Sequence, residues 1–317
     1  MARVATVPRR AGGGAPDPFD HPSTLELVAR GLAEDVGRGD VTTAATVAPG
    51  ATGRTALVAR EDCVVAGLPL VAIVLEAVAG RGRPVPSVSI RVAEGKVAGR
   101  GRTLAVVDGS LAVTLTAERL LLNLVQHLCG IATETRRYVA AVAGTGASIV
   151  DTRKTLPGLR LLQKYAVRCG GGRNHRFGLD DGVLVKDNHI AACGSVAAAI
   201  RAARDSVPHS LKIEVECERM AQVEAALRAG ADAILLDNMT PREVRAAVHR
   251  IGGRAIVEVS GGVSLDTVRA YAESGADIVS IGRLTHSVRA VDVGLDFLSR
   301  QSPRTGPRGR TPSRRGR

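Results

Sequence analysis

The second half of the chain alternates between short apolar runs and helix-like stretches. The apolar runs lie at residues 147–151, 182–186, 211–216, 232–237, 254–259 and 276–281. From the second run onward, each gap holds an amphipathic stretch rich in Ala, Arg and Glu, at residues 194–204, 218–229, 240–250 and 264–274. A strand–helix repeat of this kind requires parallel strands joined by right-handed crossovers, with helices covering both faces. The sequence therefore predicts an α/β fold whose C-terminal part is built from repeated βα units.

Every apolar run ends in polar or glycine-rich residues. In chain order, these endings lie at 151–154, 186–189, 214–216, 237–238, 260–262 and 282–283. In a βα barrel the carboxyl ends of the strands carry the active site, and phosphate commonly binds in the loops after the last two strands. Backbone N–H groups of glycine turns can approach phosphate oxygens closely. We therefore expect Ser260, Gly261, Gly262, Gly282 and Arg283 to hold a phosphate group.

Basic side chains are concentrated between residues 148 and 189. Five of them lie just past a strand end or in a glycine-rich loop: Arg153, Lys154, His175, Arg176 and Lys186. The loop itself contains three consecutive glycines at 170–172. Positive charge beside glycines favours a ligand with several negative charges, and arginine suits bidentate recognition of carboxylates. Lys164 and Arg168, on the helix expected between the first two runs, are interpreted as ordinary surface charges.

Two acidic residues, Glu216 and Asp237, end successive apolar runs and lie 21 residues apart, which is one βα unit. Their carboxylates are therefore expected at adjacent strand ends. The pair predicts a site for Mg²⁺, bound directly or through water, or a contact with sugar hydroxyls. Salt bridges to the neighbouring basic residues are the alternative. The spacing does not decide whether Glu214 or Glu216 faces the site, and we assign the role to Glu216.

Residues 20–130 lack a regular strand–helix period and predict a separate α/β sandwich domain. Strands are expected at 54–60, 88–92, 103–107 and 111–115, and helices at 21–32, 68–78 and 116–127, with another helix at 133–142 before the repeat. Residues 34–43 are interpreted as a turn that leads into an extended run. On helix 116–127, Arg119 shares a polar stripe with Asn123 and Gln126, so periodicity alone predicts a solvated residue.

Composition limits where the chain works and what it binds. The five cysteines are scattered without close spacing, which indicates reduced thiols in a cytoplasmic protein. No membrane span and no secretory signal are expected. The formal net charge is +12, but half of it comes from six arginines in residues 301–317. Residues 1–19 and 300–317 are expected to be disordered tails. Because aromatic residues make up only 2% of the chain, binding of nucleic acid is not expected as its main function.

Three long motifs resemble those of the quinolinate phosphoribosyltransferase family, a group of type II phosphoribosyltransferases. They are Asp151-Thr152-Arg153-Lys154-Thr155 with Pro157-Gly158-Leu159-Arg160, Gly170-Gly171-Gly172 with Asn174-His175-Arg176, and Lys186-Asp187-Asn188-His189. Shorter pieces that also fit lie at 34–43, 118–123, 236–238, 260–262 and 285–287. The resemblance implies a sandwich domain over 20–130, joined by a C-terminal helix at 288–299. It also implies an incomplete barrel of about six or seven parallel strands over 131–287.

The resemblance further implies an activity and partners. A member of this family would join quinolinate to phosphoribosyl pyrophosphate and give nicotinate mononucleotide, pyrophosphate and CO₂, with Mg²⁺ as cofactor, in NAD biosynthesis. Such enzymes are homodimers or assemblies of dimers, in which Arg119 would reach the active site of the neighbouring subunit. The alternative is a related phosphoribosyltransferase-like protein, associated with molybdenum transport, that acts on another acid.

By the same resemblance, each candidate residue has an expected role. Quinolinate would contact Thr152, Arg153, Lys154, His175, Arg176 and Lys186, together with Arg119 from the neighbouring subunit. The phosphoribosyl group would contact Glu216, Asp237, Ser260, Gly261, Gly262, Gly282 and Arg283. Lys154, Glu216 and Asp237 would be catalytic, and the last two would also be the metal ligands.

Overall fold

The computed structural model describes residues 17–80 and 82–301. The tails predicted at 1–19 and 300–317 therefore fall mostly outside the described residues. Phe19 corrects the first boundary, because its side chain is buried and its ring meets Tyr165 edge-on, with 4.8 Å between the centroids. Gln301 corrects the second boundary, because it is the last residue of a strand.

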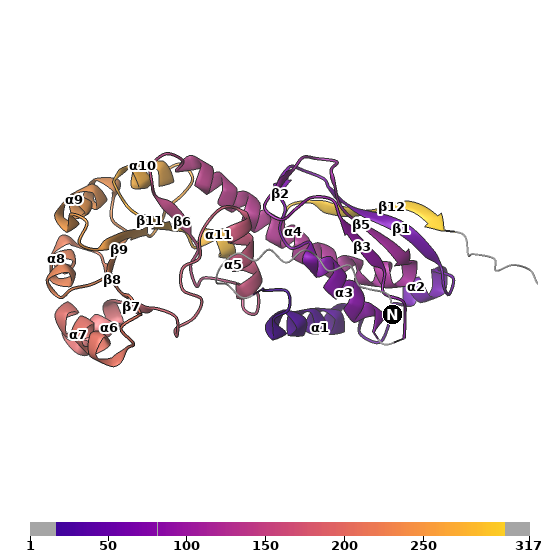
Figure 1. Cartoon of the computed structure of the whole chain (residues 1–317), viewed down its shortest axis with the longest axis horizontal. Helices are drawn as coiled ribbons and strands as arrows, with labels where there is room; N and C mark the ends of the chain where they lie inside the picture. Colours follow the sequence, from indigo (N-terminus) through magenta and orange to yellow (C-terminus); the bar gives the residue numbers. More distant parts are fainter. Residues whose placement is uncertain (1–16, 81, 302–317) are drawn as a thin grey trace, which may run out of the picture.

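The N-terminal part is an antiparallel sheet packed against helices (Figure 1). Its elements are α1 (Pro22–Val36), α2 (Val41–Thr46), β1 (Thr52–Ala59), β2 (Cys63–Val64), α3 (Pro69–Ala79), β3 (Ser87–Ile90), β4 (Val97–Ala98), β5 (Thr103–Ser110), α4 (Leu111–Ala141) and β12 (Val293–Gln301). The main sheet has the strand order β12-β1-β5-β3, and β2 pairs separately with β4. Leu57, Ala105 and Val107 turn from this sheet into the main hydrophobic core.

Helix α4 is longer than predicted. The sequence suggested three elements here: a strand at 111–115 and helices at 116–127 and 133–142. Instead, one helix begins after Ser110, whose side chain accepts a hydrogen bond from the backbone of Val113. Tertiary packing overrides the strand-like composition of its first turn, where Leu111 and Val113 are buried. Gly130 does not end the helix. A Cβ there would lie 2.3 Å from the carbonyl oxygen of Arg289, so glycine permits a close approach of the chains.

The C-terminal helix predicted at 288–299 is wrong. Residues 293–301 form strand β12, which pairs antiparallel with β1 along its whole length. The edge of β1 offers unpaired backbone groups, and pairing with them outweighs the local preference of the segment. In Figure 1 the yellow strand β12 accordingly lies beside the violet strand β1, so the chain returns to its N-terminal part.

The extended run predicted at the end of 34–43 is also wrong. Residues 41–46 form helix α2, which Asp40 caps by accepting a hydrogen bond from the Thr43 backbone at 2.9 Å. Aspartate is among the strongest N-capping residues, and here this local signal outweighs the β-branched composition of the turn that follows.

The C-terminal part alternates strands and helices (Figure 1). Its strands are β6 (Ser148–Val150), β7 (Val183–Val185), β8 (Ile213–Cys217), β9 (Ala233–Asp237), β10 (Ile256–Ser260) and β11 (Ile278–Ser280). Its helices are α5 (Arg160–Cys169), α6 (Asp187–Cys193), α7 (Val196–Ser206), α8 (Met220–Arg228), α9 (Pro241–Ile251), α10 (Val268–Glu273) and α11 (Arg283–His286).

All six strands are parallel, in the order β6-β11-β10-β9-β8-β7. Because β6 pairs with β11 and not with β7, the sheet is a barrel that stays open between β6 and β7. The predicted incomplete barrel is confirmed.

Helix α4 connects the two parts. It packs against α1 and α3 on one side and against α5 and β6 of the barrel on the other. Buried residues of both parts belong to one continuous hydrophobic core, so the barrel is held in a fixed relation to the sheet. Across residues 17–80 and 82–301, no helix combines the length and apolarity needed to cross a membrane.

Candidate active site

The carboxyl ends of the parallel strands bring most of the predicted residues to one side of the barrel. Thr152, Arg153 and Lys154 follow β6, and Lys186 follows β7. Glu216, Asp237 and Ser260 lie in the last residues of β8, β9 and β10. We distinguish a rim cavity, an acidic pair and a buried network beneath them.

The rim cavity has a volume of about 350 Å³ and is formed by the loops after β6, β10 and β11. It is lined by these predicted residues: Thr152, Lys154, Ser260, Gly261, Gly262, Gly282 and Arg283. Among its described lining residues none is acidic, and the basic ones are Lys154, Arg283 and His286. A hollow formed by backbone turns and cations suits a phosphate group.

Glycine is required at the turns of the rim cavity. Gly261 and Gly262 have φ angles of 91° and 62°, in the left-handed region that other residues rarely adopt. A Cβ at Gly261 would also lie 2.2 Å from Oδ1 of Asn238. At Gly282, a Cβ would crowd the Lys154 side chain at 3.1 Å. A larger residue at any of these places would therefore narrow the cavity or displace Lys154.

The acidic pair consists of Glu216 and Asp237 on the neighbouring strands β8 and β9. Lys186 Nζ lies 2.7 Å from Oε2 of Glu216. Burial raises the pKa of Asp237, and the negative charge of Glu216 raises it further, while Lys186 and Lys154 act to lower it. The repulsion between the two carboxylates is what a divalent cation relieves, so this donor set fits Mg²⁺.

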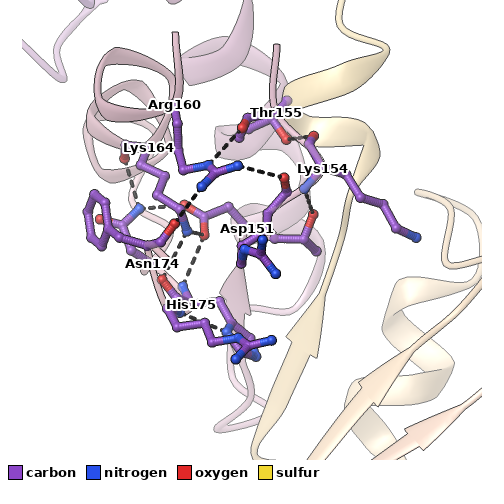
Figure 2. A network of polar contacts seen from close by, with 12 residues as sticks. Asp151, Lys154, Thr155, Arg160, Lys164, Asn174 and His175 are labelled. Atoms are coloured by element: carbon purple, nitrogen blue, oxygen red, sulfur yellow. Dashed lines mark hydrogen bonds and ion pairs between the residues drawn. The ribbon is translucent and has the colours of Figure 1, made fainter. Parts of the chain in front are cut away.

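The buried network joins the end of β6 to the glycine-rich loop (Figure 2). Asp151 and Lys164 form an ion pair, and both side chains are fully buried. Asp151 also accepts hydrogen bonds from the Asn174 side chain and from the His175 backbone, the latter at 3.0 Å. Lys164 donates a second hydrogen bond, at 2.9 Å, to the carbonyl oxygen of His175. The network therefore fixes the loop that carries His175 and Arg176.

Burial dominates the energetics of the Asp151–Lys164 pair. It raises the pKa of Asp151 and lowers that of Lys164, and the attraction between the two charges offsets these shifts only in part. Desolvation often exceeds attraction in a buried ion pair, which then contributes geometry more than stability. Figure 2 also shows Arg160 beside the network, between Lys164 and Thr155. It donates to the Thr155 hydroxyl at 3.0 Å and to the Phe177 carbonyl oxygen at 2.9 Å.

Lys164 was missed by the sequence analysis, which interpreted it as a surface charge. Its side chain has an exposed fraction of 0%, and its ammonium lies 5.0 Å from the centroid of the Phe177 ring. A signal was available in the spacing, because Leu161 and Val167 lie three residues before and after it on one helix face. Arg168, in contrast, is partly exposed and bonds to Asn174 Oδ1 at 3.2 Å.

Two arginines repel each other in the mouth of the barrel, by which we mean the space at the carboxyl ends of its strands. The Nε atom of Arg153 is buried and has no hydrogen-bond partner within the described part of the chain. Arg176 donates to the Gly182 carbonyl oxygen at 2.8 Å. Burial lowers the pKa of Arg176, and the positive charge of Arg153 lowers it further. Cations held together in this way favour an anionic ligand between them.

Both ring nitrogens of His175 are engaged within the chain. Nδ1 accepts a hydrogen bond from the Arg176 backbone at 2.7 Å, and Nε2 lies 3.2 Å from Glu214 and 3.5 Å from Glu258. Burial acts to lower the pKa of His175, but the hydrogen bond to Glu214 and the charges of Glu258 and Glu214 outweigh it and raise the pKa. A direct contact of His175 with a substrate stays a prediction.

Glu214 and Glu216 have different surroundings, although residues two apart in a strand share a face. Glu214 contacts His175 in the interior, and Glu216 contacts Lys186 at the strand end. Glu258 was not among the residues predicted from the sequence. Its signal was a charged residue between Val257 and Val259 in a strand-like run.

Arg119 is not joined to the mouth of the barrel by any described contact of this chain. It lies in the first half of α4, its side chain is exposed, and this side chain makes no hydrogen bond or ion pair with a described residue. The role expected for it in a neighbouring subunit stays a prediction.

Comparisons with known proteins cover nearly all of the described chain. Residues 40–129 match the family model for the N-terminal domain of quinolinate phosphoribosyl transferase, and residues 131–296 match the model for its C-terminal domain. A relative from Mycobacterium leprae, named nicotinate-nucleotide pyrophosphorylase (carboxylating), is 47% identical over 86% of this chain and 96% of its own length.

Two further relatives agree with these matches. A protein from Nicotiana glauca, named quinolinate phosphoribosyltransferase (decarboxylating) 2, mitochondrial, is 35% identical over 93% of this chain and 88% of its own length. The crystal structure of nicotinate-nucleotide pyrophosphorylase from Ehrlichia chaffeensis is 40% identical, with a TM-score of 0.80. That match covers 86% of this chain and 98% of the other.

Proposed function

The chain belongs to the quinolinate phosphoribosyltransferase family, and we propose that it transfers a phosphoribosyl group from phosphoribosyl pyrophosphate to quinolinate in NAD biosynthesis. The products are nicotinate mononucleotide, pyrophosphate and CO₂. One observation carries the proposal. Beside a rim cavity without acidic lining residues, Arg153 and Arg176 lie close enough for the charge of Arg153 to lower the pKa of Arg176. The cavity suits a phosphate, and the two cations suit a dicarboxylate.

Quinolinate is a dianion, and the arginines are the groups that recognise it. The free Nε of Arg153 supports a bidentate contact with one carboxylate. Arg176 contributes a second planar cation, and Lys186 borders the same space from the end of β7. Thr152 and His175 complete this subsite. Arg119 of the neighbouring subunit completes it in a homodimer or an assembly of dimers.

The sugar donor occupies the rest of the mouth. Ser260–Gly262 and Gly282-Arg283 bind its 5′-phosphate in the rim cavity, and Lys154 lies between this cavity and the dicarboxylate. Glu216 and Asp237 would hold the ribose hydroxyls and Mg²⁺, and the bound cation would compensate the negative charge of the leaving pyrophosphate.

The reaction depends on positioning and electrostatics and needs no covalent nucleophile. The bond between ribose C1 and pyrophosphate breaks through an oxocarbenium-like state, and the ring nitrogen of quinolinate forms a bond to C1. The resulting pyridinium accepts the electron pair released when the adjacent carboxylate leaves as CO₂, and the ring carbon then takes up one proton. Lys154 is placed to compensate negative charge on the donor, and the arginines hold the ring in line.

The test is turnover of the purified protein with quinolinate, phosphoribosyl pyrophosphate and Mg²⁺, with nicotinate mononucleotide and CO₂ measured together. Nicotinic acid replaces quinolinate in a parallel reaction. We expect product from quinolinate alone, with one CO₂ for each nucleotide, because only a dicarboxylate satisfies both arginines. Product from nicotinic acid would contradict the dicarboxylate subsite. Absence of product from both would favour the paralogue that acts on another acid. The cytoplasm is the proposed location.

A further inference from the structure

Two acidic residues meet inside the barrel below the proposed quinolinate subsite. Glu214 on β8 and Glu258 on β10 have exposed fractions of 9% and 2%. Both carboxylates approach Nε2 of His175, and the ligand atoms of the three residues all lie within 4.8 Å of one another. We call these three residues the interior triad. Two carboxylates at this separation, away from water, require a proton or a cation between them.

Glu258 is the more deeply buried of the two carboxylates in the triad. Its Oε1 atom is buried and has no hydrogen-bond partner within the described chain. Burial and the negative charge of Glu214 raise the pKa of Glu258 to about 8, against the weaker effects of His175 and the Ser280 hydroxyl. A neutral acid at this place can donate its proton to Glu214, whereas a carboxylate would face Glu214 as a second anion.

A divalent cation is disfavoured at the triad, although one His and two Glu are suitable donors. The positive charge of Lys164 already acts on His175, and those of Arg153 and Arg176 act on each other close by. Glu214 also attracts Arg176. Adding the two positive charges of a divalent cation to this region would cost more electrostatic free energy than adding the single charge of a proton. A proton on Glu258 removes the repulsion without adding a net positive ion.

We propose that Glu258 carries a proton in the working enzyme, donates it in a hydrogen bond to Glu214, and thereby acts as a positioning residue for His175 and Arg176. The link is direct, because Glu214 lies 3.2 Å from Nε2 of His175 and the Arg176 backbone donates to Nδ1 of the same ring. With Glu258 neutral, the triad presents one carboxylate to the arginines instead of two. This inference rests on the proposed function, because it assumes that the arginines receive a dianion.

The kinetic test compares the pH dependence of wild type, Glu258→Gln and Glu258→Leu. In wild type, the KM for quinolinate should rise above about pH 8 by up to about tenfold per pH unit, as one proton is lost, while the KM for phosphoribosyl pyrophosphate changes little. Glu258→Gln mimics the neutral acid and should remove this rise. Glu258→Leu cannot bond to Glu214 and should show a raised KM at every pH. An unchanged alkaline rise in Glu258→Gln would overturn the proposal.

Glu94→Gln is the matched control. Glu94 is another carboxylate, partly buried, whose pKa is raised by burial, but it accepts hydrogen bonds from the Gly67 and Leu68 backbones and from Tyr165, away from the triad. This variant should retain the alkaline rise of wild type. Loss of the rise in Glu94→Gln as well would mean that any buried glutamate has this effect, and would contradict a specific role for Glu258.

A second readout does not need turnover. The ring resonances of ¹⁵N-labelled histidine can be followed against pH, with those of His175 assigned by a His175→Asn variant among the seven histidines. We expect a step near pH 8 in wild type that is absent in Glu258→Gln. A wild-type His175 signal without this step would overturn the proposal. The proposal would also be overturned if wild type bound one equivalent of divalent metal tightly and Glu258→Gln did not. If the step is present but quinolinate is not turned over, the proposed function fails and the protonated triad stands.

Discussion

The rim and the interior of this barrel use charged residues in different ways. At the rim, the Lys154 side chain is exposed and its ammonium makes no hydrogen bond or ion pair in the described chain, so its charge is available to a ligand. In the interior, Lys164 is fully buried and both of its hydrogen bonds are made within the chain. The comparison indicates that rim charges bind while interior charges position. Substitutions at the two places should therefore change different properties.

The largest expected effect is on catalysis at the rim. Lys154→Ala should lower kcat/KM for phosphoribosyl pyrophosphate by roughly 100-fold, because one charged group aimed at the donor is lost. The urea midpoint should stay close to that of wild type, since no described bond of the side chain is removed. Lys212→Ala is the control, because Lys212 is exposed just before β8, at the opposite end of the strand. Full turnover by Lys154→Ala would contradict the assignment of Lys154 to the active site.

The next effect is on stability in the interior. Asp151→Asn keeps the shape of the side chain but leaves the Lys164 charge buried without its partner. The free energy of unfolding should fall by about 3–5 kcal/mol, as is typical when one half of a buried pair is removed. The double variant Asp151→Leu/Lys164→Met should regain most of this loss in urea denaturation. If the single variant were as stable as wild type, the ion pair would not hold the loop as described.

A smaller effect separates charge from geometry within the mouth. Arg153→Lys keeps the positive charge but removes the planar fork, and should raise the KM for quinolinate by about tenfold while leaving that for the sugar donor unchanged. Arg173→Lys serves as the control, because Arg173 is exposed on the neighbouring loop and its side chain makes no described bond. Equal effects of the two substitutions on the KM would argue against a bidentate contact by Arg153.

A further effect is a pH dependence of stability from Glu258. Its pKa is raised from 4.5 to about 8 on folding, so the native state holds a proton that the unfolded chain has lost. The stabilisation is therefore complete below about pH 4.5 and is lost as the pH rises through about 8. Because Glu258→Gln mimics the neutral acid, the two proteins should be similarly stable near pH 4.5, and wild type should lose stability relative to the variant as the pH rises towards 8 in urea titrations. A difference independent of pH would mean that Glu258 is ionised in the folded protein.

The sequence predicted the rim better than the interior, for a physical reason. Residues such as Lys186 and Asp237 follow apolar runs directly, and a parallel barrel gathers all such positions at one end. The roles of Lys164 and Glu258 depend on partners from other elements. The local sequence pattern shows only that a charged residue lies among apolar ones, and it does not identify those partners. The same limit explains the secondary-structure errors. Strand β12 exists because β1 offers an edge, and the first turn of α4 is helical because Leu111 and Val113 are buried against other elements.

The most direct test of this account measures unfolding free energy and kcat/KM on the same preparations of Lys154→Met and Lys164→Met. The substitution is identical in both, and only its place in the barrel differs. We predict that Lys154→Met loses roughly 100-fold in kcat/KM at nearly unchanged stability, and that Lys164→Met loses about 3 kcal/mol or more of stability. The residual activity of folded Lys164→Met should then be limited by a raised KM for quinolinate. Equal losses of stability in the two variants, or an active and stable Lys164→Met, would contradict the division between a binding rim and a positioning interior.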